Sequence, residues 1–418
     1  CLMSLDRSHC LSLDTQDPLA ALRDQFEIPD DVLYLDGNSL GARPKAASER
    51  ARQVIEQEWG QGLIRSWNQA GWIDLPRQVG GQIAALIGAK PEEVVVTDST
   101  SVNLFKVAAA ALKQQLATDP SRRVILSEPG NFPTDLYMLQ GLSQFMTGGP
   151  VLETQPADSL LERIDTDVAV VVLTHVHYKT GKLHDMAAIT RRAHEQGALV
   201  VWDLSHSGGA VEVDLNGVNA DFAIGCGYKY LNGGPGAPGY IFVAERHLAA
   251  FEQPLSGWFG HEAPFAMRDD FAPAGDIRRA LTGTPSVVAT QLLSVGLDTF
   301  ADTTMAELRA KSVALTQLFI ELVETRLPDA GFELVSPRNA NERGSQVAFA
   351  HPEGYAIMQA LIDRGVIGDF RAPDILRFGF APLYVRFTDV WDSVDCLKDI
   401  MDNRTWDQPK YHERHAVT

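Results

Sequence analysis

Apolar runs and helical stripes alternate along the first two thirds of the chain. Residues 167–174, 198–203, 222–225 and 240–243 are continuous apolar runs, typical of strands buried on both faces. Shorter strands are expected at residues 32–35, 93–97 and 123–127. Helices with one apolar stripe are expected at residues 45–59, 77–87, 101–116 and 186–196. This alternation predicts an α/β fold with a mostly parallel central sheet.

The pattern changes after about residue 286. A long helix at 305–326 is followed by expected strands at 333–335, 345–350, 368–370 and 375–380, with helices at 356–364 and 390–401. We therefore predict an N-terminal segment (1–45) that packs with a small domain, a large cofactor-binding domain (46–285) and a small C-terminal α+β domain (286–418). The tail after Trp406 is polar, and we expect it to be loosely held.

Composition and charge narrow the possible partners. The 418 residues are 45% hydrophobic and 22% charged, and the formal net charge is −18. An acidic surface repels phosphate backbones, which disfavours nucleic acid and anionic membranes. Cys1, Cys10, Cys226 and Cys396 are scattered, so neither a disulfide framework nor a zinc cluster is expected. With no long apolar run and no signal-peptide pattern, we expect a cytoplasmic location and no membrane partner.

The strongest candidate for chemistry combines Asp203 and Lys229. Asp203 ends a buried strand, and Lys229 follows the next strand and precedes a glycine-rich stretch. Ligands of open α/β sheets bind at the carboxyl ends of strands. Pyridoxal 5′-phosphate needs a lysine for its Schiff base and an acid that keeps its ring nitrogen protonated. The alternative is an ordinary Asp–Lys ion pair at the edge of the sheet.

A second candidate is the turn at residues 97–101, which joins a strand to a helix. Its hydroxyls and backbone N–H groups gather where the helix dipole favours an anion such as a phosphate. The alternative is plain helix capping by Ser or Thr.

Three further motifs are rejected as sites. Residues 234–239 match GxGxxG, but they precede a strand and contain prolines, so they are no dinucleotide fingerprint. His175 and His177 have the spacing of metal ligands, yet no third ligand cluster is nearby, and we expect no metal. Cys226 lies near Lys229, but nothing marks it as a nucleophile.

Two positions leave alternatives open. Phe132 could stack on a flat cofactor and Asp135 could reach its hydroxyl or imine region, or the Pro133 segment could be an ordinary turn. Arg377 lies in an apolar strand and needs an anionic partner. That partner is either the carboxylate of a substrate or an internal Asp or Glu.

In combination, several motifs carry a resemblance to a known family. They are LDGNSLGARP (35–44), FPTD (132–135), THVHYKTG (174–181), WDLSHSGGAVEVDL (202–215), GYKYLNGGPG (227–236), SGWFGH (256–261) and LRFGFAPLY (376–384). The chain resembles the kynureninases, pyridoxal-phosphate hydrolases of fold type I, over about residues 33–404. Tyr228 stands where cysteine desulfurases of the same superfamily commonly carry His.

The resemblance implies a role for each candidate residue. Lys229 would form the Schiff base, Asp203 would pair with the ring nitrogen and Phe132 would stack on the ring. Further cofactor contacts are implied for Thr100, Ser101, Asp135, Thr174, His206 and Tyr228, and Arg377 would hold the substrate α-carboxylate. Trp258 and Thr284 match residues that reach the site from a partner subunit, which implies a homodimer.

The implied reaction is hydrolysis of L-kynurenine, an amino-acid substrate, to anthranilate and L-alanine, in tryptophan catabolism. In it Lys229 acts as base and Tyr228 is a candidate acid. A desulfurase-like or aminotransferase-like enzyme is the alternative. Thr284 stands where relatives that favour 3-hydroxykynurenine carry Asn, and residues 62–67 contain no His. We therefore expect 3-hydroxykynurenine to be the poorer substrate, unless Arg65 or Ser66 serves as donor to its hydroxyl.

Overall fold

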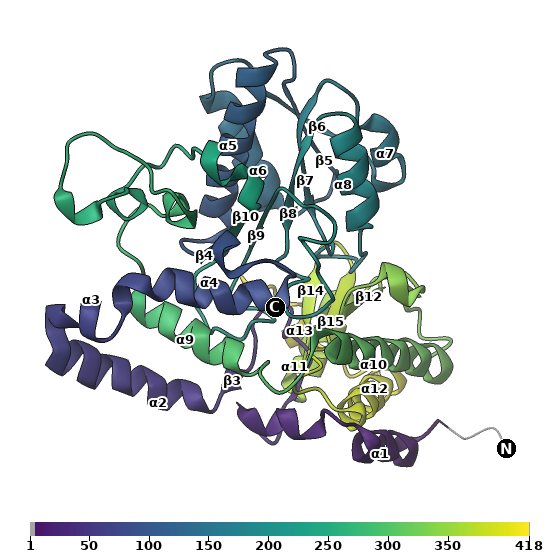
Figure 1. Cartoon of the computed structure of the whole chain (residues 1–418). Coiled ribbons are helices and arrows are strands. Elements are labelled where there is room, and N and C mark those ends of the chain that lie inside the picture. The colour runs from purple at the N-terminus through teal and green to yellow at the C-terminus, as the bar shows by residue number, and fades with distance from the viewer. Residues whose placement is uncertain (1–4, 418) are drawn as a thin grey trace.

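The computed structural model describes residues 5–417, and a seven-stranded sheet lies at its centre (Figure 1). The strand order is β4-β10-β9-β8-β7-β5-β6, and β10 runs antiparallel to both of its neighbours. The other neighbouring strands run parallel, so the predicted fold class is confirmed. The strands are β4 (Val94–Val96), β5 (Val124–Ser127), β6 (Val151–Thr154), β7 (Val168–Thr174), β8 (Leu199–Asp203), β9 (Phe222–Gly225) and β10 (Tyr240–Val243).

Helices cover both faces of this sheet because successive strand side chains point to opposite faces. Val172 and Val201 belong to the core beneath α5 and α6, whereas Leu173 and Trp202 belong to the core that includes α4 and α8. Figure 1 shows α5 and α6 on one side of the strands and α8 on the other. These helices are α4 (Leu75–Leu86), α5 (Thr100–Thr118), α6 (Pro133–Phe145) and α8 (Met186–Glu195), and short α7 (Leu160–Arg163) precedes β7.

A second, antiparallel sheet of four strands forms from the C-terminal part of the chain. Its order is β11-β12-β15-β14; α10 and α11 pack on it, and α12 packs on both of these helices. The strands are β11 (Glu333–Leu334), β12 (Gln346–Ala350), β14 (Asp369–Arg371) and β15 (Ile375–Gly379). The helices are α10 (Met305–Arg326), α11 (Gly354–Asp363) and α12 (Phe387–Asp402). The expected α+β region is therefore present.

The N-terminal segment contacts this second region. Helix α1 (Arg7–Gln16) packs against α12, and β2 (Leu33–Tyr34) pairs in parallel with β13 (Val366–Ile367). A short β1 (Phe26–Glu27) pairs with β3 (Arg43–Pro44).

Helix α9 (Val287–Asp298) contacts α2 (Ala46–Gln53) and α4, elements from before residue 285. After α2 the helix widens into π-helical turns over Val54–Gly62. A short helix, α3 (Ser66–Gln69), follows. The division into three segments at residues 45 and 285 stays a prediction.

The C-terminal tail differs from our expectation. Helix α13 (Pro409–His412) buries Tyr411, whose hydroxyl donates to a carboxylate oxygen of Asp363 at 2.6 Å. The Tyr355 hydroxyl donates to the carbonyl of Glu413 at 3.0 Å. The prediction of a loosely held tail is therefore wrong, because polar side chains there find partners on α11. Within the described residues, no helix has the length and apolar character to cross a membrane.

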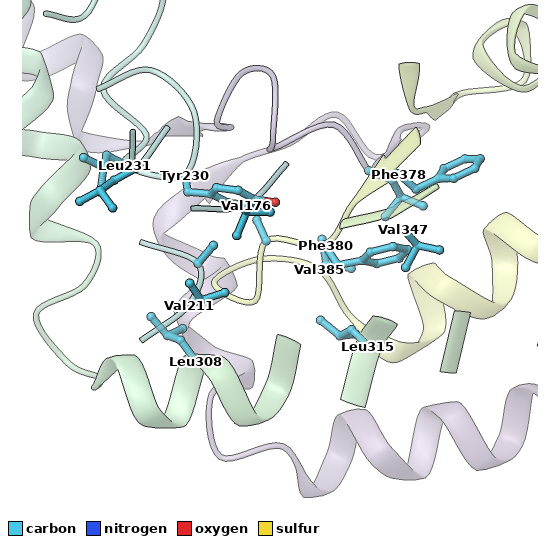
Figure 2. Close-up of a cluster of buried hydrophobic side chains, with 14 of the residues drawn as sticks. Val176, Val211, Tyr230, Leu231, Leu308, Leu315, Val347, Phe378, Phe380 and Val385 are labelled. Carbon is cyan, nitrogen blue, oxygen red and sulfur yellow. The ribbon is translucent and has the colours of Figure 1, made fainter. Parts of the chain in front are cut away.

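A buried hydrophobic cluster ties the loops of the large sheet to the second sheet (Figure 2). Tyr230 and Leu231 follow Lys229 directly, and Val347 and Phe378 face each other across β12 and β15. The labelled members are Val176, Val211, Tyr230, Leu231, Leu308, Leu315, Val347, Phe378, Phe380 and Val385. This packing fixes the segment that carries Lys229. Cys1 lies outside the described residues, and Cys10, Cys226 and Cys396 are unpaired thiols.

Candidate active site

A pocket lies where β7 and β8 end and where the chain leaves β9. Thr174 and Asp203, the last residues of β7 and β8, are paired across the sheet. The loop after β9 places Lys229 beside them. The pocket is lined by Ser99, Thr100, Ser101, Phe132, Asp135, Thr174, Asp203, Ser205, His206, Cys226, Tyr228, Lys229, Ala237 and Gly239. The pocket thus contains all nine residues for which the sequence predicted cofactor contacts from the same chain. Trp258 and Thr284, expected to reach it from a partner subunit, are not among them.

Lys229 is held by the backbone of its own loop and by a close approach of Gly41. The Gly41 N–H donates to the carbonyl of Tyr228 at 2.9 Å, and a Cβ at Gly41 would stand 2.4 Å from the carbonyl of Lys229. The Lys229 Nζ lies 3.1 Å from His206 Nε2 and 5.8 Å from the ring centroid of Phe132. Burial, together with the charge of Lys229, lowers the pKa of His206 well below its usual range. His206 therefore accepts a hydrogen bond from the ammonium.

Asp203 is buried and shares its surroundings with a second carboxyl group. Its Oδ1 accepts hydrogen bonds from the Ser205 N–H at 2.9 Å and from the Ser205 hydroxyl at 2.6 Å. Burial, the charge of Asp203 and a hydrogen bond between the two carboxyls raise the pKa of Asp135 well above its usual range. The pair thus carries one negative charge, which suits a cationic ring nitrogen.

The turn before α5 supplies the positive end of a helix. Ser99 caps α5, and Thr100 and Ser101 are its first residues. Asp98, at φ 42°, turns the chain, and its carbonyl accepts from the Gly239 N–H at 2.8 Å. A Cβ at Gly239 would stand 3.1 Å from the Thr100 nitrogen, so this close approach favours glycine. Backbone N–H groups and hydroxyls here face the pocket, as an anion-binding helix end requires.

Phe132 stands at the mouth of the pocket, 39% exposed, directly before α6. The segment is therefore not an isolated Pro turn, because Pro133 occupies the first turn of a helix, where its missing N–H costs nothing. The ring of Phe132 contacts Tyr178 edge-on, with centroids 5.2 Å apart. Burial raises the pKa of Tyr228, which also lines the pocket, to about 12, so its hydroxyl is a proton donor at neutral pH.

Two residues that hold this arrangement were not found from the sequence. The side-chain oxygen of Asn131 accepts hydrogen bonds from the Phe132 N–H and the Thr174 hydroxyl, both at 2.7 Å. Ser205 fixes Asp203, as described above. The asparagine directly before Phe132-Pro133 and the Asx turn that the Ser205 N–H closes on Asp203 are the local signals that could have indicated them.

The donors in the pocket fit pyridoxal 5′-phosphate, the cofactor that the sequence resemblance implies. Within the described residues, the Thr100 hydroxyl oxygen is buried without a hydrogen-bond partner. Buried polar atoms are normally paired, so this hydroxyl indicates a polar ligand. Thr100 and Ser101 with the N-terminus of α5 would hold the phosphate. Lys229 and Asp203, on the opposite side, would hold the carbonyl carbon and the ring nitrogen.

Arg377 does not line this pocket and has an internal partner. Its Nε donates to Asp369 Oδ1 at 2.7 Å, and its Nη2 pairs with Asp369 Oδ2. The Nη1 donates to the carbonyl of Tyr178 at 2.7 Å. The structure thus realises the internal-carboxylate alternative, and the substrate contact of Arg377 stays a prediction.

The remaining predicted residues lie outside the pocket. Trp258 is 37% exposed and Thr284 is exposed, and neither lines the pocket of its own chain. His177 bonds through Nε2 to the carbonyl of Gly130 at 2.8 Å, and burial lowers the pKa of His175 to about 3. Among residues 5–417, no group of three or more metal-ligating side chains is placed to hold an ion.

Comparison with known proteins extends over nearly the whole chain. The family described as "Kynureninase C-terminal domain" matches residues 308–397. Kynureninase of Pseudomonas fluorescens is 56% identical over 413 residues, covering 99% of both chains. That of Burkholderia mallei (strain SAVP1) is 55% identical over 414 residues, again with 99% of each covered.

Solved structures show the same fold at low identity. The apo cysteine desulfurase from Thermococcus onnurineus NA1 has a TM-score of 0.76 at 20% identity and covers 91% of this chain and 98% of its own. A C-DES mutant, described with glycine covalently linked to the PLP cofactor, has a TM-score of 0.77 at 18% identity and covers 90% and 99%. Likeness to desulfurases is thus one of fold, whereas the full-length identity is with kynureninases. The chain therefore belongs to the kynureninase family.

Proposed function

We propose that this chain hydrolyses L-kynurenine to anthranilate and L-alanine, with pyridoxal 5′-phosphate held in the pocket. The observation that carries the proposal is the convergence of Lys229, Asp203 and the N-terminus of α5 on one pocket. When bound, the cofactor supplies an aldehyde that condenses with an amino group and a cationic ring that withdraws electrons. The residues of the chain bind and orient the reactants and move the protons.

Lys229 is the base for the substrate Cα proton. Its Nζ forms a hydrogen bond with His206 Nε2. His206 has a lowered pKa and stays neutral, so it accepts this hydrogen bond and adds no second positive charge beside Lys229. Asp203, whose carboxylate Ser205 fixes, would hold the ring nitrogen protonated. Water then adds at the γ-carbonyl, and the Cβ–Cγ bond breaks. Tyr228, whose pKa burial raises, would return a proton to the carbon left behind.

Substrate choice follows from the segment at residues 62–67. Arg65 donates to the carbonyls of Gly62 and Gln61, and the Ser66 hydroxyl donates to the carbonyl of Glu58 at 2.6 Å. Both candidate donors are thus engaged by their own segment. A 3-hydroxyl on the substrate ring would be buried without a partner, which costs ~1–3 kcal/mol. Comparing kcat/KM should show L-kynurenine preferred over 3-hydroxykynurenine, and equal values would contradict this.

A homodimer with the site at the subunit interface is also proposed. Trp258 and Thr284 lie outside the pocket of their own chain and are open to a second copy. Trp67 and Trp258 both contact Phe259, with ring centroids 5.7 Å and 4.6 Å apart. This links residues 62–67 to the predicted interface. The unpaired thiols Cys10, Cys226 and Cys396 fit the reducing cytoplasm, which fractionation of the native host would test.

The test is product analysis with the purified holoenzyme. L-Kynurenine should give equimolar anthranilate, followed by its fluorescence, and L-alanine. Lys229→Ala should abolish turnover and the visible absorbance of lysine-bound cofactor while leaving circular dichroism unchanged. Lys113→Ala, an exposed lysine on α5, is the matched control. Turnover of cysteine or a keto acid without anthranilate would instead support the desulfurase-like or aminotransferase-like alternative.

A further inference from the structure

A buried cluster of charges lies beside the pocket, around Arg377. Arg377 on β15 and Asp369 on β14 are register partners across the two strands, and both side chains are buried. Asp369 takes two N–H groups of the guanidinium, and Arg377 Nη2 also donates to the Ser39 hydroxyl at 2.8 Å. Ser39 in turn donates to Asp369 Oδ2 at 2.7 Å. The orientation of the guanidinium is thus fixed from two sides.

A second acid, Asp36, completes the cluster. Its carboxyl lies close to that of Asp369, and two carboxylates buried side by side repel each other, which favours a proton on one of them. Burial and the charge of Asp369 raise the pKa of Asp36 well above its usual range, whereas the guanidiniums of Arg377 and Arg371 help to keep the pKa of Asp369 low. The proton therefore resides on Asp36.

The charges of the cluster do not cancel. Arg371 Nη2 lies 3.3 Å from Asp369 Oδ2, so two guanidiniums share one carboxylate. Among residues 5–417, Arg371 donates a side-chain hydrogen bond only to the carbonyl of Phe370, and its side chain is 34% exposed. With Asp36 protonated, the net charge of the four side chains is positive by one.

The cluster is connected to the pocket. Arg377 donates to the carbonyl of Tyr178, whose ring contacts Phe132 at the mouth of the pocket. The charges of Arg377 and Arg371 also act on His206, lowering its pKa. An unbalanced cation therefore lies close enough to the pocket for its charge to act on His206, which lines the pocket.

We infer that Asp369 and Asp36 are positioning residues for the substrate carboxylate. Asp369 orients Arg377. Because Asp36 carries a proton, the Arg377–Arg371 pair keeps one uncompensated positive charge, which would bind the α-carboxylate. The inference rests on the proposed function. Asp369, the internal partner of Arg377, thus helps Arg377 to bind the substrate carboxylate and does not compete with that carboxylate.

The first test compares two ligands that differ only in the carboxylate. Kynuramine is kynurenine with hydrogen in place of the α-carboxylate. In Asp369→Asn holoenzyme, KM for L-kynurenine should rise about tenfold or more, because one amide oxygen cannot hold the two-pronged guanidinium. The inhibition constant of kynuramine and kcat should change less than about twofold. Asp374→Asn, in the turn between β14 and β15, is the matched control.

The second test uses pH. Asp36 is faced by Asp369 and Arg371 on β14, by Arg377 on β15, and by Tyr34, Tyr230 and Tyr384, whose pKa values burial raises. The tyrosines stay neutral and the arginines stay charged, so Asp36 is the group that loses a proton as pH rises. Its ionisation removes the net positive charge and raises KM for L-kynurenine. Asp36→Asn cannot ionise, and its KM should stay flat over that range.

The outcomes separate the two proposals. If the wild-type holoenzyme does not convert L-kynurenine, the proposed function fails. If it converts L-kynurenine but Asp369→Asn binds it as well as or better than wild type, Asp369 is a competitor of the substrate and the inference is wrong. If Asp36→Asn keeps the wild-type rise of KM with pH, the shared proton plays no part. Should Asp369→Asn fail to fold, Ser39→Ala, which removes the bridge between Asp369 and Arg377, takes its place with the same expected preference.

Discussion

At the residue scale, Asp203 should matter through its charge. Asp203→Asn keeps the shape of the side chain but removes the negative charge that, in the proposed mechanism, would hold the ring nitrogen protonated. Losing the charged partner of a buried cation costs ~2–5 kcal/mol, so kcat should fall roughly 30- to 5,000-fold at saturating cofactor. Ser205→Ala, which keeps the charge and loses one hydrogen bond to Oδ1, should cost far less. A fall of only a few-fold in Asp203→Asn would argue against this role.

Contacts between residues also decide which site residues could be predicted from the sequence. Asp203 could be predicted because it ends a strand with a clear apolar pattern. Lys229 could be predicted because it lies in the short loop after the next such strand. Asn131 could not, because it acts by holding Phe132 and Thr174, which lie in different elements. The partner of Arg377 depended on the register of β14 against β15, and a shift of one residue would have placed another side chain opposite.

At the element scale, the helix that would hold the phosphate is anchored by a buried lysine. Lys106 Nζ on α5 bonds to Asp98 at 2.5 Å and to the carbonyl of Ala280 at 2.9 Å. Lys106→Met should therefore loosen the turn at Asp98, weakening cofactor affinity about tenfold and lowering the free energy of unfolding by about 1–3 kcal/mol. Equilibrium dialysis of pyridoxal 5′-phosphate measures the first effect. Lys113→Met on the exposed face of α5 is the control, and equal affinities would refute the anchoring role.

A buried carboxylate joins α8, β8 and the chain after β10. Asp221 accepts from His194 Nε2 at 2.7 Å, from His247 Nε2 at 2.8 Å and from the Val200 N–H at 2.9 Å. Burial alone would raise the pKa of Asp221, but these hydrogen bonds outweigh it and bring the pKa down to about 2.

Because the folded pKa of Asp221 is below its ordinary value of about 3.9, its ionised form stabilises the fold above that value. The contribution, about 2–3 kcal/mol, is lost as pH falls from about 4 towards 2. Urea unfolding should show Asp221→Asn less stable than wild type at pH 7, with the difference shrinking below pH 4. Asp302→Asn, an exposed acid, should show neither effect. A difference that stays constant down to pH 2.5 would contradict the assignment.

Helices and strands differ in how clearly their hydrophobic pattern predicts them. Six strands of the large sheet were predicted within about one residue because runs such as Val168–Thr174 are apolar on both faces. The edge strand β6 was missed because its residues are exposed or only half-buried and carry no apolar run. Helix α6 was missed because Pro133 marks both turns and first helical turns, and only the packing of Leu139 and Leu142 on the sheet decides between them. The wrong expectation for the tail has the same origin, since its partner Asp363 is 48 residues away from Tyr411 in the sequence.

At the scale of the whole molecule, exposed aromatic side chains mark the surface that we propose as the dimer interface. Trp258 and its neighbour Phe265 are exposed aromatics, with ring centroids 5.4 Å apart, and Ile64, in the segment whose Trp67 contacts Phe259, is 77% exposed. Exposed apolar side chains gathered on loops are typical of an interface. A two-fold dimer would place these loops of one subunit over the pocket of the other.

Complementation between two inactive variants tests this arrangement. Lys229→Ala removes the base but keeps Trp258 and Thr284, whereas a Trp258→Ala, Thr284→Ala double variant keeps Lys229. If Trp258 and Thr284 act across the interface, a mixed dimer contains one complete site, composed of Lys229 from one subunit and the loops of the other. Random reassociation of equal amounts makes half of the dimers mixed, so activity should reach roughly a quarter of wild type. Differently tagged subunits would be unfolded and refolded together, and light scattering should give twice 45.7 kDa. Activity no greater than that of the two variants refolded separately would place Trp258 and Thr284 in the site of their own chain or outside any site.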